Sequence, residues 1–165
     1  MDDERAIVAA QLGREPRAFR RVVVRCPFGR PAVTEQSPYD DSGEPFPTTY
    51  YLTCPHLVAA VSRLEAAGGV ERWSKNVGDD PALARDLERA TQRQRAVRRA
   101  LAEGAEGRDG GSSLDLGIGG SRTPARLKCL HAHVAFALAH PDYELGQLVL
   151  GELEPLWPQR CCTRA

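Results

Sequence analysis

The sequence predicts a single α+β domain in which a small, mainly antiparallel sheet packs against several helices. One reason is the length, because 165 residues suit one domain with a substantial core. Another is that short runs rich in β-branched residues are concentrated between residues 19 and 54. The third is that apolar residues recur at helical spacing further along, which predicts helices over 55–67, 81–103 and 124–139.

The sheet is predicted to be a meander of three strands. A short helix over residues 3–12 precedes it and ends at Gly13. The strands are predicted at 19–25, from residue 32 onward, and at 48–52. In a meander the first and third strands run parallel. The residues that follow them, Cys26 and Cys54, are therefore expected at the same end of the sheet.

Proline, glycine and aspartate mark the ends of the predicted helices. Pro55 opens the first of the three, and Gly68-Gly69 closes it. Asp79 or Asp80 can cap the second, which is the helix over 81–103.

The third helix is predicted to start at Pro124 and to end before Pro141, and a last helix is expected after that proline. Two segments lack a helical or strand pattern. Residues 104–116 are rich in glycine and serine and are predicted to be a mobile loop, and residues 158–165 are predicted to be a disordered tail.

Composition and charge narrow the classes of function. Positive and negative side chains balance at 22 each, so net charge predicts no nucleic-acid partner. There is no transmembrane run, and the start Met1-Asp2-Asp3-Glu4 does not resemble a signal peptide, so we expect a cytoplasmic protein without a membrane partner. In a reducing compartment, its five cysteines are expected to bind metal, react or pack rather than form disulfides.

Three cysteines and a histidine point to a metal site. In the predicted third helix, Cys129 and His133 are four residues apart and can reach one point. Cys26 and Cys54, each followed by a proline, could complete the site from the end of the sheet. Because thiolate and imidazole are the ligands that tetrahedral zinc prefers, zinc is the expected cofactor.

Other interpretations of these residues stay open. An iron–sulfur cluster is a variant in which Cys161 or Cys162 supplies the fourth thiolate. Alternatively, Cys129 and His133 only pack in the core, since unpaired cysteine is among the most buried residue types. His131 is predicted to point to a different face of the helix, beside its leucines.

A glycine turn suggests a second function, that of a phosphate- or nucleotide-binding enzyme. It precedes the predicted third helix, and free amides at a helix N-terminus bind phosphate. The candidate residues are Gly117, Gly119, Gly120, Arg122 and Lys128. The pattern matches neither a Walker loop nor a dinucleotide fingerprint, and an ordinary glycine turn is the alternative. In such an enzyme His131 or His133 could transfer protons and Cys54 could be a nucleophile, but no catalytic residue is assigned.

The third function considered is a non-catalytic domain that binds a protein partner. The helix over 81–103 has an apolar stripe that includes Leu83, Leu87 and Leu101, which is predicted to be buried. Its many arginines are predicted to be exposed, and they could form the surface that a partner contacts.

Three motifs carry a resemblance to a known family. They are RCPFGRPAV at 25–33, PTTYYLTCPHLVAAVSRLE at 47–65, and GIGG with KCLHAHVAFALA within 117–139. Together they make the chain resemble the bacterial domain of unknown function 501 family over nearly its whole length. Members are often encoded beside a septum formation initiator and an exopolyphosphatase. The resemblance thus implies a cytoplasmic housekeeping role, with a partner linked to cell division as one alternative, and it defines no activity.

The resemblance also marks individual residues. Those that match the family motifs are Cys26, Cys54, Cys129, His131, His133 and the run Ser62-Arg63-Leu64-Glu65. The chain departs from the family pattern near its end, where Trp157 is followed by Pro158 in place of a cysteine. It also has Tyr143-Glu144-Leu145-Gly146 in place of an Asn-Pro-Val-Gly turn.

Overall fold

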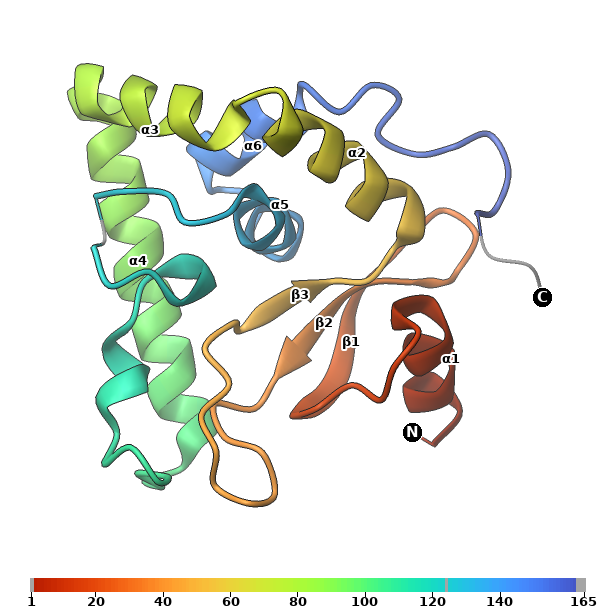
Figure 1. The fold of residues 1–165 in the computed structure, drawn as a ribbon, viewed down its shortest axis with the longest axis vertical. Coiled ribbons are helices and arrows are strands. Elements are labelled where there is room, and N and C mark those ends of the chain that lie inside the picture. The colour runs from red at the N-terminus through yellow and green to blue at the C-terminus, as the bar shows by residue number, and fades with distance from the viewer. Residues whose placement is uncertain (1, 124, 163–165) are drawn as a thin grey trace.

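A three-stranded antiparallel sheet lies at the centre of the fold in the computed structural model, which describes residues 2–123 and 125–162 (Figure 1). Its strands are β1 (Phe19–Arg25), β2 (Pro31–Gln36) and β3 (Tyr50–Leu52), in the order β1-β2-β3. Thr34 pairs with Val22 on one side and with Tyr51 on the other. The predicted meander is therefore confirmed, and β1 and β3 run parallel to each other.

The central strand is covered on both faces. All six residues of β2 are buried, although alternate side chains of a strand point to opposite faces. The helix α1 (Asp2–Leu12) packs on β1 and β2 from one side. The helix α5 (Leu130–Ala139) contacts all three strands from the other side (Figure 1). This accounts for the nearly all-round apolar sequence of α5, because α2 and α6 cover the faces that the sheet leaves open.

The other helices frame α5 and the sheet. They are α2 (Pro55–Ala66), α3 (Gly69–Asp79), α4 (Pro81–Ala102) and α6 (Glu144–Leu150). Three of these confirm predicted helices, and Asp80 caps α4 through a hydrogen bond from the amide of Ala82.

The sequence analysis missed α3. Gly68, with φ of 84°, ends α2 in the left-handed conformation, but the chain then starts another helix. That helix buries Trp73 and Val77, which are four residues apart on one face. The helical spacing of Trp73 and Val77 is visible in the sequence, but Gly68 and Gly69 were interpreted only as the end of the preceding helix.

The start of the third predicted helix was wrong, because α5 begins at Leu130 rather than at Pro124. Two features explain why the described residues before Leu130 are not helical. The Ser121 hydroxyl donates to the carbonyls of Thr123 and Arg126, which forms a local turn. The carboxylate of Glu65 on α2 accepts a hydrogen bond from the amide of Leu130 and so fixes the first turn of α5. Pro124 itself lies outside the described residues.

The prediction that the arginines of α4 are exposed was wrong for Arg98, which is 0% exposed. It lies on the buried face of the helix with Leu87 and Gln94. Its guanidinium donates to the carbonyls of Ser113, Phe46 and Pro47 at 3.2, 3.0 and 3.3 Å. Burial lowers the pKa of Arg98.

Arg98 thus fastens two irregular segments to α4. One is the loop between β2 and β3. The other is the glycine-rich segment after α4, which forms turns and a short 3₁₀ helix, Ser112–Asp115. Within the described part of the chain, no helix has the length and apolar character needed to cross a membrane.

Candidate functional site

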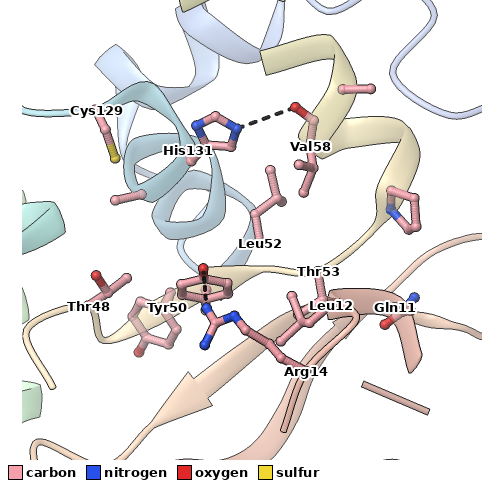
Figure 2. A pocket seen from close by; sticks show the side chains of 14 residues that line it. Gln11, Leu12, Arg14, Thr48, Tyr50, Leu52, Thr53, Val58, Cys129 and His131 are labelled. Carbon is pink, nitrogen blue, oxygen red and sulfur yellow. Dashed lines mark hydrogen bonds between the residues drawn. The ribbon is translucent and has the colours of Figure 1, made fainter. Parts of the chain in front are cut away.

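A cavity of about 600 Å³ lies between the end of α1, strand β3, helix α2 and the start of α5 (Figure 2). We call it the β3 groove. Apolar side chains make up much of its wall, among them Leu12, Leu52 and Val58. Gln11, Arg14, Cys129 and His131 contribute polar groups. A cavity of this size, apolar with a few polar groups, is the kind of feature that binds ligands.

The groove follows one edge of the sheet. Tyr50, Tyr51, Leu52 and Thr53 all line it, although their side chains alternate between the two faces. Consecutive residues can share one cavity when it runs along the edge of their strand. Since β3 is the last strand of the sheet, this edge has no neighbouring strand.

The pairing register shows which backbone groups face the groove. The amide of Gln36 donates to the carbonyl of Thr49, and that of Thr53 donates to the carbonyl of Ala32. In an antiparallel pair, every second residue bonds to the partner strand. The N–H and C=O groups of Tyr50 and Leu52 therefore point away from β2, and no hydrogen bond joins them to another described residue. We call these four groups the free edge of β3.

Two side chains of the groove, those of Gln11 and Thr53, have a buried oxygen atom with unused hydrogen-bonding capacity. Gln11 donates through Nε2 to the carbonyl of Pro31, but its buried Oε1 has no partner among the described residues. The hydroxyl of Thr53 is likewise buried without a partner there. Because buried polar groups are almost always paired, these atoms indicate a place where a bound molecule could supply the missing partner.

One cation lies at the mouth of the groove. Arg14 follows α1 and is exposed. It donates to the hydroxyl of Tyr51 at 3.0 Å, and its guanidinium lies 5.8 Å from the centre of the Tyr51 ring. These contacts hold the guanidinium of Arg14 at the side chain of Tyr51 on β3.

His131 lies in the wall of the groove and is held from both sides of its ring. Its Nδ1 is 3.1 Å from the carboxylate of Glu65, which can only accept when ionised, so Nδ1 is the donor. Its Nε2 is 3.3 Å from both the hydroxyl of Ser62 and the carbonyl of Val58 (Figure 2). The ring therefore joins α5 to α2 at three points.

The contacts that run from Ser62 to His131 and from His131 to Glu65 resemble those of a serine-hydrolase triad. Two features differ from such a triad. The Val58 carbonyl lies as close to Nε2 as the serine does, so the two oxygens compete for this nitrogen. Ser62 also lies inside α2, where the backbone amides are used by the helix and cannot stabilise an oxyanion. We therefore interpret this arrangement as a link that positions His131.

The predicted metal ligands come from three places: the end of the sheet, the residue before α5, and α5 itself. Cys26 follows β1 and is buried in the turn that leads to β2. Cys54 is buried at the start of α2, and both cysteines lie at the end of the sheet where β2 begins, as the meander predicts. Cys129 precedes α5 as its N-cap residue, so the expected shared helix face with His133 was wrong.

His133 is buried in a different environment from the groove. It is 2% exposed, and its Nδ1 is 2.8 Å from the hydroxyl of Tyr143. Burial lowers the pKa of His133 to about 4 and raises that of Tyr143 well above its usual value, so both side chains are neutral at pH 7.

Among the described residues, no group of three or more histidine, cysteine, aspartate or glutamate side chains is arranged to hold a metal ion. Burial raises the pKa of Cys129, which is one of the residues that line the groove. Zinc binding, and the iron–sulfur variant, stay predictions.

The glycine turn is not placed at the N-terminus of α5, which corrects the basis of the phosphate hypothesis. Residues Ile118–Gly120 form a short 3₁₀ helix, and residues 121–129 separate it from the start of α5. Gly119 packs against α5, where an added Cβ would lie 3.1 Å from that of Ala132. Gly120, Arg122 and Lys128 do line one shallow hollow of about 310 Å³. Phosphate or nucleotide binding there stays a prediction.

Sequence reasoning missed most of the groove. Gln11 and Arg14 belong to a part of the chain that had been assigned only as a helix and its end, and nothing in their spacing links them to β3. Glu65 was noted within a motif, but its contact with His131 joins residues 66 positions apart.

Comparisons with known proteins give a family without an assigned activity. Neither a curated protein nor a solved structure matches the chain. The family model described as a protein of unknown function, DUF501, matches residues 22–151. That span contains β2, β3 and β1 from Val22 onward, helices α2 to α6, and the groove residues from Thr48 to Ala132. The chain therefore belongs to the DUF501 family, as its motifs indicate.

Proposed function

We propose that this protein binds an extended peptide in the β3 groove, with the peptide pairing as an additional strand on the free edge of β3. The observation that carries the proposal is the outward orientation of the N–H and C=O groups of Tyr50 and Leu52 within a cavity. Strand addition to an exposed sheet edge is a common mode of peptide recognition.

The spacing of these groups favours a peptide over a compact small molecule. Tyr50 and Leu52 are two residues apart, so their outward groups repeat at about 6.6 Å, from roughly 3.3 Å per strand residue. An extended peptide has the same repeat and offers both donors and acceptors. It can therefore satisfy all four groups, which a compact ligand with one or two polar atoms cannot do.

The remaining groups of the groove define the preferred sequence. Leu12, Val58 and Ala59 offer an apolar surface for one side chain of the peptide. Arg14 supplies a positive charge at the mouth, which favours an acidic residue nearby. Gln11 Oε1 can accept a hydrogen bond from a donor on the peptide. The proposed ligand is thus an extended segment with an apolar residue close to an acidic one.

A display library of random ten-residue peptides, selected on the immobilised protein, tests this proposal. Enriched peptides should combine apolar and acidic residues, and methylation of alternate backbone nitrogens should abolish their binding. Ala59→Arg fills the groove from an exposed position on α2 and should remove binding. Ala66→Arg, also exposed on α2 but outside the groove, is the matched control and should bind normally.

Two results would contradict the proposal. The first is a selection that enriches no peptide over the Ala59→Arg protein. The second is a bound peptide that tolerates methylation at every backbone nitrogen, because the contact would then involve side chains alone.

The partner surface predicted on the helix over 81–103 is less well supported than the groove. Several exposed arginines of α4 bind groups of the same chain: Arg89 pairs with Asp86, Arg93 with Asp142, and Arg99 with Asp115. A partner on this helix would have to compete with these pairs, whereas the free edge of β3 has no competitor among the described residues.

A further inference from the structure

Two cysteines that are distant in the sequence meet at the start of α2. Cys54 caps this helix and is 2% exposed, and Cys162 lies in the irregular segment after α6 and is exposed. Their Sγ atoms are 3.8 Å apart, although 108 positions separate them in the chain. Both are free cysteines, so two thiols are in contact.

The segment that carries Cys162 is anchored along α3 and α2. Glu152 accepts hydrogen bonds from the guanidinium of Arg72 and from Nε1 of Trp73 on α3. Further along, the Pro155 carbonyl lies 3.0 Å from Nε2 of His56, in the first turn of α2. These contacts lead the end of the chain across the helices to the position of Cys54, so the meeting of the thiols follows from an ordered path.

The two thiols differ in accessibility. Burial raises the pKa of Cys54 to about 11, and the neighbouring Cys162 adds to this shift. Cys54 is therefore a protonated thiol at pH 7, shielded from solvent. The exposed thiol of Cys162 is the one that a reagent in solution can reach.

We propose that Cys54 and Cys162 are an oxidation site at which a hydroperoxide converts the two thiols into a disulfide. This proposal is independent of peptide binding in the β3 groove. It requires the sulfur atoms to approach from 3.8 Å to the disulfide length of about 2.05 Å. Among the described residues 158–162 there is no helix or strand that would resist this movement.

The reaction takes place in two steps. The Cys162 thiolate attacks one oxygen of hydrogen peroxide, the O–O bond breaks, and the sulfur becomes a sulfenic acid as hydroxide leaves. The Cys54 sulfur then attacks the Cys162 sulfur and loses its proton, and the sulfenic oxygen leaves as water. In total, two thiols and one peroxide give one disulfide and two waters, and the two sulfurs supply the two electrons.

The disulfide would fix the end of the chain beside the β3 groove. Thr53 and Pro55, the neighbours of Cys54, both line the groove. The bond would also close a loop of 108 positions, which restricts the unfolded chain and should raise the midpoint of urea unfolding.

Peroxide titration of the full chain, whose metal content is first measured by elemental analysis, tests the proposal. After the remaining thiols are alkylated, non-reducing peptide mass spectrometry should find a linked Cys54–Cys162 peptide. The unfolding midpoint should rise and return when dithiothreitol is added. Cys162→Ser should form no disulfide at Cys54, whereas Cys161→Ser, the matched control, should behave like the wild type.

Three results would overturn the proposal. Peroxide could join Cys161 to Cys162, or link separate chains, while Cys54 remains open to alkylation. Peroxide could also oxidise Cys162 to the sulfinic acid with no disulfide, which would mean that Cys54 cannot approach. Lastly, protein purified with stoichiometric zinc could resist oxidation until a chelator is added, which would assign the two thiols to a metal site instead.

Discussion

The buried histidine of α5 makes the stability of the protein depend on pH between about pH 7 and pH 4. Burial holds the pKa of His133 at about 4, while the ordinary value is 6.5. As the pH falls through 6.5, His133 of the unfolded chain takes up a proton and that of the folded chain does not. The stability that the neutral histidine contributes is thus present above pH 6.5 and is lost as the pH falls toward 4.

The size of this effect follows from the two pKa values. One pKa unit corresponds to about 1.36 kcal/mol, so the full difference of 2.5 units amounts to roughly 3 kcal/mol. By pH 5 the unfolded histidine is almost fully protonated and the folded one is mostly neutral. The loss between pH 7.5 and pH 5 should then be about 2 kcal/mol.

Urea unfolding, measured at several pH values by tryptophan fluorescence, isolates this effect when the wild type is compared with His133→Gln. Glutamine can hydrogen-bond to the Tyr143 hydroxyl but does not titrate, and Asp86, which acts on Tyr143, remains in both proteins. The difference in unfolding free energy between the two proteins should narrow by about 2 kcal/mol from pH 7.5 to pH 5. A difference that stays constant over this range would refute the reasoning.

Three further predictions concern single residues and use thermal unfolding as the measurement. Arg98→Met should cost about 3–5 kcal/mol, because buried carbonyls lose their donors, whereas Arg99→Met at an exposed position should change stability by under about 0.5 kcal/mol. Equal losses for the two would contradict the role of Arg98. Gly69→Ala should cost about 1–3 kcal/mol, since its Cβ would lie 2.7 Å from the backbone oxygen of Leu64. Gly78→Ala has no such contact and should stabilise α3 by up to about 1 kcal/mol, and a loss there would indicate strain that is not visible in the structure. Asp80→Ala should cost about 1 kcal/mol through loss of the cap on α4, and an unchanged melting temperature would show that solvent replaces this cap.

Local patterns were sufficient to predict most of the fold. The β-branched run FRRVVVR became β1. Pro55 at the first position of α2 and the cap residue Asp80 of α4 correctly placed these two helices. The errors came from tertiary contacts. The start of α5 depends on a carboxylate from another helix, Glu65, which no local signal near Pro124 reveals. Arg98 was predicted to be exposed because it is charged, although it lies on the buried face of α4.

The candidate site was predictable only in part. The sequence identified His131 and Cys129 as notable residues, and both line the groove. It assigned the principal role to His133, because the assumed start of the helix placed that residue beside Cys129. The free edge of β3 could not be predicted, because the order of the strands decides which one lacks a neighbour. Arg14 reaches the groove only through the packing of α1 against the sheet.

The buried guanidinium of Arg98 has a consequence for how the protein opens locally. Its donors hold the backbone at Phe46 and Pro47 on one side and at Ser113 on the other. Both segments help to bury the guanidinium of Arg98. If either segment left α4, its own carbonyls would lose their donor and the charge of Arg98 would become exposed. We therefore expect amide hydrogens in both segments to exchange with solvent at one common rate, as a single cooperative unit. The β3 groove begins at Thr48, directly after the first of these segments, so this opening would also release the chain that leads into β3.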